Sequence, residues 1–184
     1  VTQTGALTVG GSSTINAGAN PIALNNAGNS FTGAVALTNS GANAVAISSS
    51  GPLALGASTL GSGALTANAV GITQSGPIIQ AAAAGSATFN AGAGAIALTS
   101  AGNDFTGAVS LNNSGANNVS ITDANEIQLG TLVVGSGSLA VNASGAITRT
   151  GAITQAAGAG AATFSAGANP ITLTNSGNDF TGAV

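Results

Sequence analysis

Apolar residues recur along the chain in pairs separated by one position. The clearest pairs are Val45 and Ile47, Leu53 and Leu55, and Ile96 and Leu98. A spacing of two returns side chains to the same face of a β-strand. The stretches between the pairs are rich in Gly, Asn, Ser and Pro, which are typical of tight turns. The pattern therefore predicts short strands of about three to five residues, roughly eight to ten residues apart, and no helix.

These strands belong to a long internal repeat. The segment Gly28-Asn-Ser-Phe-Thr-Gly-Ala-Val35 returns 74 positions later as Gly102-Asn-Asp-Phe-Thr-Gly-Ala-Val109, and 75 positions after that as Gly177-Asn-Asp-Phe-Thr-Gly-Ala-Val184. A fixed period of this kind is typical of arrays of stacked structural units. We divide the chain, as one continuous segment 1–184, into a partial unit 1–27, units 28–101 and 102–176, and a partial unit 177–184.

Length differences between the copies predict where the chain turns. The segment Gly71–Gln74 corresponds to Gly145–Arg149, which is one residue longer, and Ala81–Gly85 is about three residues longer than its counterpart at 9–11. Stacked repeats accept insertions at outward turns, because the paired strands stay in place. Both places are therefore predicted turns.

Short strands with small residues between them favour an all-β, right-handed parallel β-helix, also called a β-solenoid. Hairpin sheets usually carry aromatic pairs, and aromatic residues are only 3% of this chain. A unit of 74–75 residues would hold three turns of about 25 residues or four of about 19, and the number of strand pairs favours three. We expect a rod of roughly seven to ten turns, about 35–45 Å long, with Asn or Thr ladders at its turns. Neither end resembles a cap, so we expect a window of a longer array.

Composition and charge exclude several classes of function. Charged residues are only 3% of the chain, and His and Cys are absent. A single cation, Arg149, cannot neutralise a nucleic-acid backbone, and no residue suits zinc or another transition metal. No apolar run is long enough for a membrane span, and no secretion signal precedes the repeats, so we expect any such signal outside this segment. The 44% of hydrophobic residues argues against a disordered linker.

The four carboxylates are the remaining candidates for chemistry. Asp104 and Asp179 occupy equivalent positions of successive copies, and Asp123-Ala-Asn-Glu126 is the densest acidic stretch. No calcium-loop pattern surrounds them, so we interpret Asp123 as part of a turn in which the carboxylate bonds its own backbone. Asn103-Asp104-Phe105 is interpreted as a turn with an inward aromatic side chain, and Arg149 as a solvated surface residue. We therefore expect no catalytic, cofactor-binding or metal-binding residues, no cofactor, and no enzymatic activity.

The repeated Asn-Asp-Phe-Thr-Gly-Ala-Val, together with Gly145–Thr148, Val119–Asp123 and Ile127–Gly130, resembles the stalk repeats of large bacterial two-partner-secretion adhesins of the filamentous haemagglutinin type, above all those of biofilm matrices. The resemblance covers the whole chain. Similar Gly/Ala/Asn-rich repeats also occur in autotransporter passengers. The resemblance implies a secreted protein at the bacterial surface or in the extracellular matrix, exported through an outer-membrane partner that recognises another region.

Two functions follow as hypotheses. The first is an adhesive stalk that contacts exopolysaccharide or sister rods, since the net charge of −3 opposes side-by-side association only weakly. The second is a passive spacer with no ligand of its own. Two further alternatives fit less well: ice binding would need regular Thr rows, and a polysaccharide-cleaving β-helix would need more basic residues than Arg149.

Overall fold

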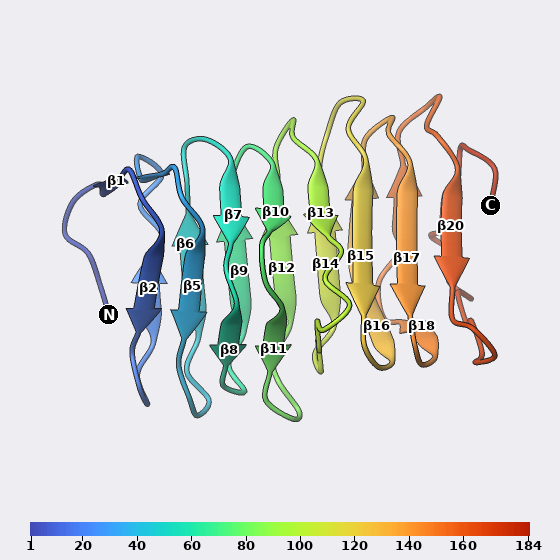
Figure 1. Ribbon diagram of the computed structural model, residues 1–184. Coiled ribbons are helices and arrows are strands. Elements are labelled where there is room, and N and C mark those ends of the chain that lie inside the picture. Colours follow the sequence, from blue (N-terminus) through green and yellow to red (C-terminus); the bar gives the residue numbers. More distant parts are fainter.

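The computed structural model describes residues 1–184 and consists of parallel strands joined by turns, without a helix. Each strand inside a sheet pairs with strands one turn earlier and one turn later; Leu53 lies beside Ile72, and Ile72 beside Ile96. The chain makes about seven turns of about 22 residues. In Figure 1 it advances from left to right while the nearer strands run downward and the fainter ones behind run upward, which is right-handed winding. The predicted right-handed β-solenoid is confirmed.

Two sheets form the opposite faces of this flattened rod, and a separate short pair, β1 (Thr8–Val9) with β4 (Ser30–Phe31), lies near the N-terminus (Figure 1). The front sheet contains β2 (Ser13–Asn16), β5 (Val35–Thr38), β7 (Leu53–Leu55), β8 (Ser58–Leu60), β10 (Ile72–Gln74), β11 (Ile78–Gln80), β13 (Ile96–Leu98), β15 (Val119–Asp123), β17 (Leu139–Ala143) and β20 (Ala162–Ser165). The back sheet contains β3 (Ile22–Leu24), β6 (Val45–Ser48), β9 (Leu65–Asn68), β12 (Ala87–Asn90), β14 (Val109–Asn112), β16 (Ile127–Val134), β18 (Ile147–Arg149) and β19 (Ile153–Gln155).

One sequence unit makes three and a half turns. Strand β3 belongs to the back sheet, and β6, β9 and β12 stack on it in the next three turns. The sequence equivalent of β3 one unit later is β13, which follows β12 but belongs to the front sheet. The predicted range of three to four turns therefore brackets the observed value, while the count of strand pairs, which favours three, is too low. Successive copies of any motif consequently lie on opposite faces of the rod.

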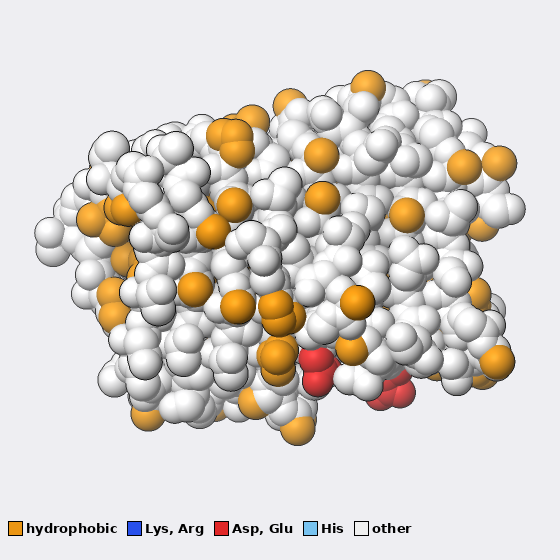
Figure 2. Space-filling view, viewed as in Figure 1, with side chains coloured by type: hydrophobic (Ala, Val, Ile, Leu, Met, Phe, Trp, Pro, Cys, Tyr) orange, Lys and Arg blue, Asp and Glu red, His pale blue; other side chains and the backbone are white.

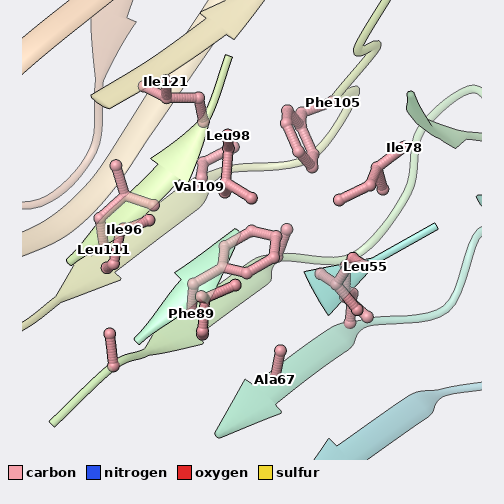
Figure 3. Close-up of a cluster of buried hydrophobic side chains, with 14 of the residues drawn as sticks. Leu55, Ala67, Ile78, Phe89, Ile96, Leu98, Phe105, Val109, Leu111 and Ile121 are labelled. Atoms are coloured by element: carbon pink, nitrogen blue, oxygen red, sulfur yellow. The ribbon is translucent and has the colours of Figure 1, made fainter. Parts of the chain in front are cut away.

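The interior is a continuous column of inward-facing aliphatic and aromatic side chains. The core cluster contains 36 buried residues. The largest buried side chain, Phe89, meets Phe105 edge-on with ring centroids 5.8 Å apart, among Leu55, Ile78 and Leu98 (Figure 3). The inward aromatic predicted for Asn103-Asp104-Phe105 is confirmed.

Both predicted turns are found, one of them shifted. Residues Ala81–Gly85 connect β11 to β12 outside the sheets, as expected. In the other case Ile72–Gln74 and Ile147–Arg149 themselves are strands, and the turn lies just before them. The additional residue is absorbed at Gly145–Ala146, ahead of the strand, so the paired residues keep their places.

Glycine is required where successive turns approach most closely. A Cβ on Gly135 would lie 2.1 Å from the carbonyl oxygen of Gly115, one turn earlier. The amide of Gly135 also donates a hydrogen bond to Asn113 Oδ1 at 3.0 Å. The equivalent Gly61 of the preceding unit has the same 2.1 Å approach to a backbone oxygen. Only glycine lets the turns stack at one strand spacing here.

The turn length can be tested with engineered cysteines, since the chain has none of its own. Ala54 and Thr73 are register partners that point outward. Their Cα atoms are separated by one strand spacing, about 4.8 Å, which suits a disulfide. We expect the pair A54C/T73C to form a disulfide on mild oxidation, seen as a mobility shift on a non-reducing gel. The control A54C/I79C, which a 25-residue turn would favour, should keep free thiols; the reverse result would refute the observed register.

The stacking role of glycine can be tested by one substitution made at two sites. Gly135→Ala should lower the free energy of unfolding by about 1–3 kcal/mol, because its Cβ has no space. Gly51→Ala is the matched control, since a Cβ there meets no atom within 4 Å. It should leave stability unchanged or slightly raised. Chemical denaturation measures both, and equal losses would contradict the close-approach explanation.

Candidate functional site

Three of the four carboxylates gather at one edge of the rod. Asp104 lies beside Ile79 in an isolated bridge, Asp123 ends β15, and Glu126 immediately precedes β16. Stacking of the turns brings these separate segments together: the amide of Phe105 donates to Asp123 Oδ2 at 2.9 Å. The acidic side chains visible in Figure 2 lie at the lower edge of that view, in a notch of the surface.

A groove of about 850 Å³ opens at this edge. One wall is formed by Ala82 and Ala83 of the long turn, and the lining includes Phe105 and Ile127, both buried. The remaining lining residues are mostly polar or small and come from turns that are far apart in the sequence. They are Asp104, Thr106, Ala124, Asn125, Glu126, Gln128, Ser144, Gly145, Ala146, Thr148 and Asn169.

Asp123 lies beneath the groove and ties two turns together. Its Oδ1 accepts a hydrogen bond from the amide of Asn125 at 2.8 Å, which confirms the predicted turn, and its Oδ2 accepts the one from Phe105. Burial raises the pKa of this carboxyl above its ordinary value, the two amide hydrogen bonds oppose that rise, and the charges of Asp104 and Glu126 add to it. Asp123 is therefore a structural carboxylate, whereas Asp104 is half-exposed and Glu126 exposed.

A partly buried amide pair, which the sequence reasoning missed, holds the motif that contains Asp104. Asn103 Nδ2 donates to Gln74 Oε1 at 2.9 Å, and Gln74 Nε2 donates to Asn103 Oδ1 at 2.8 Å. The same reciprocal pair joins Gln3 and Asn29 in the preceding unit. The recurrence of Gln and Asn at matching positions was the available signal.

The prediction that Arg149 is a solvated surface residue needs a correction. Arg149 stands where the other copies have Gln3 and Gln74, and it is half-buried, not fully solvated. Its Nη1 donates to the carbonyl oxygen of Gly151. Asn178 is the equivalent of Asn29 and Asn103, the partners of the glutamines in the other copies. Its side chain contacts only backbone groups, and it accepts a hydrogen bond from the amide of Ile153 at 3.0 Å. Arg149 thus replaces the amide pair by a local turn contact.

An Asn ladder is present, but it lies at the ends of back-sheet strands and not in the turns where it was predicted. Asn112 Nδ2 donates to Asn90 Oδ1, and Asn90 Nδ2 to Asn68 Oδ1, both at 2.8 Å. The ladder follows the C-terminal ends of β9, β12 and β14. The ladder joins successive turns, and none of its residues lines the groove.

The fourth carboxylate, Asp179, does not belong to the groove. Asp179, the equivalent of Asp104, bridges to Thr154 of the back sheet and is exposed away from the groove lining. The groove itself offers two carboxylates with amide and hydroxyl groups around them. Such a set can attract a cation and form hydrogen bonds with a polar ligand.

A family model described as "Repeats of unknown function (DUF5649)" matches residues 1–38, 42–112 and 116–184. The chain belongs to this repeat family. Two of the DUF5649 matches begin at 42 and 116, 74 residues apart, so the family repeat has the length of the sequence unit. No curated protein and no solved structure matches the chain. No helix of this DUF5649 chain is long and apolar enough to cross a membrane.

The raised pKa of Asp123 predicts a specific pH dependence. The folded chain holds this proton more tightly than the unfolded chain, in which the pKa of the carboxyl is near 3.8. The stability that protonation contributes is therefore present below pH 3.8, and it is lost as the pH rises through the raised pKa of the folded chain. Asp123→Ser, with the residue found at the equivalent Ser49, removes the titration. The free energy of unfolding of the native chain minus that of the variant should fall with rising pH over this window. Urea denaturation at a series of pH values measures it, and a flat or rising difference would refute the assignment.

Proposed function

We propose that this chain is part of the stalk of a large secreted bacterial adhesin, at the cell surface or in a biofilm matrix. The observation that supports this proposal best is the uninterrupted stack, in which one core runs through every turn and the fold builds length. The resemblance to stalk repeats of the filamentous haemagglutinin type agrees with it. On this proposal an outer-membrane partner exports the protein by recognising another region.

Contact with exopolysaccharide or with sister rods would use the outward side chains. Outward positions of the front sheet carry Ala54, Thr73, Ala97, Ser120 and Ala140, which are small and uncharged. Because each unit makes a half-integral number of turns, both faces of the rod are built from the same motifs. A partner that recognises the repeat would therefore be bound on both sides, which suits cross-linking of a matrix.

The alternative is a passive spacer, which the same stack would serve equally well. A rod without a ligand needs only stacking and solubility, and the uniform small-residue faces meet both needs. The adhesive proposal differs from it in one measurable respect, since binding through repeated weak contacts must strengthen with the number of repeats.

The test compares the 184-residue chain with chains lengthened by one and three further copies of the unit 28–101, inserted after residue 101, for binding to purified bacterial exopolysaccharides. An unrelated β-solenoid of matched net charge is the control. Saturable binding whose apparent affinity rises with copy number supports the adhesive stalk. Binding no greater than the control favours the spacer, and sedimentation of the same chains shows whether the rods associate with one another.

A further inference from the structure

The groove differs in kind from the matching surface of the preceding unit. Six polar lining residues replace small or less polar ones at equivalent positions, although the core residues beside them are retained, as in Phe31 and Phe105. The replacements come from separate turns and converge on one place only after folding. They are Asp104 for Ser30, Asn125 for Gly51, Glu126 for Pro52, Gln128 for Ala54, Ser144 for Val70 and Asn169 for Gly94.

The groove is also preformed. Its wall, the turn Ala81–Gly85, is longer than the corresponding turn of the preceding unit. Thr106 holds this turn through two hydrogen bonds. Its Oγ1 donates to the carbonyl oxygen of Ala81 and accepts from the amide of Ala84 at 3.1 Å. Ala83 holds a positive φ of 55°, which is unusual for a residue other than glycine. A fixed wall reduces the ordering that a ligand would have to impose.

The charge of the groove indicates the sign of the charge that its ligand carries. Asp104 and Glu126 line it, and the buried Asp123 lies beneath. The only cationic side chain of the protein, Arg149, is half-buried against the carbonyl oxygen of Gly151. The lining therefore presents two carboxylates surrounded by neutral donors and acceptors, an arrangement complementary to a protonated amine that carries hydroxyl groups nearby.

We propose that this groove binds a segment of polysaccharide that contains amino sugars with free, protonated amino groups. Asp104 and Glu126 pair with the amines, while Asn125, Gln128 and Asn169 hydrogen-bond to ring hydroxyls. A basic peptide fits less well, because extended peptides add to free sheet edges and the strands beside the groove already have partners on both sides. The inference rests on the adhesive form of the proposed function and names its ligand and site.

The experiment titrates the 184-residue chain with a glucosamine hexamer and, separately, with an N-acetylglucosamine hexamer of the same length. Isothermal titration calorimetry at mildly acidic pH keeps the amines protonated. The glucosamine hexamer should bind more tightly. The variant D104N/E126Q should bind it about ten-fold more weakly or worse, because two charge-assisted contacts are lost.

The matched control is D179N, which removes a carboxylate at the position equivalent to Asp104 but outside the groove. It should bind the glucosamine hexamer like the native chain. The variant N125G/Q128A carries the residues of the preceding unit and should weaken both hexamers alike, since it removes hydrogen bonds without changing charge. Denaturation midpoints establish that each variant is folded. Those of D104N/E126Q and D179N should match the native chain, because Asn and Gln keep the size of the side chains they replace.

Three results would overturn the proposal: equal binding of the two hexamers, native-like binding by D104N/E126Q, or saturable binding of Ca²⁺ alone that excludes the glucosamine hexamer. The outcome is separable from that of the adhesive stalk. If neutral exopolysaccharide binds the chain while the glucosamine hexamer does not, the groove proposal fails and the stalk stands. If neither binds and sedimentation shows no association between rods, both fail and the spacer remains.

Discussion

The pairing of each turn with the turns before and after it is the constraint on which this molecule depends. Almost every residue of a turn has a neighbour one strand spacing away, and most of the 95 hydrogen bonds between backbone groups join one turn to the next. A side chain on the inside must therefore be compatible with the residues above and below it. Where the backbones themselves nearly touch, as at Gly61 and Gly135, no side chain fits at all.

The half-integral turn count places each stretch of the unit in the front sheet in one copy and in the back sheet in the next. Its neighbours stay equivalent, because Ile22 pairs with Val45 in the back sheet and Ile96 pairs with Val119 in the front sheet. Phe89 packs from the back sheet, while its equivalent Phe164 packs from the front, yet both meet a second phenylalanine edge-on, at 5.8 and 6.0 Å. The half-turn offset therefore moves a motif to the other face of the rod while the residues that stack on it stay equivalent.

The sequence was informative wherever a residue's role repeats along the axis. Paired apolar residues located the strands, the recurring Asn-Asp-Phe located an inward ring, and Asp123 was assigned to its turn. Roles that depend on which different turns lie side by side could not be predicted from the repetition. The half-turn offset and the half-buried Arg149 both follow from which segments become neighbours. The groove is the extreme case, because its lining combines residues from 82 to 169.

Stacking also determines where such a chain can acquire a new property. Inward positions are held by the turns on both sides, and outward positions in mid-strand lie on flat faces with no depth. Only the edges, where the chain crosses from one sheet to the other, accept both longer turns and changed polarity. The long turn Ala81–Gly85 and the carboxylates Asp104 and Glu126 meet at such an edge. A rod of near-uniform surface can therefore gain a specific site in one repeat without disturbing its neighbours, since the backbone pairing that supports the site is the same in every turn.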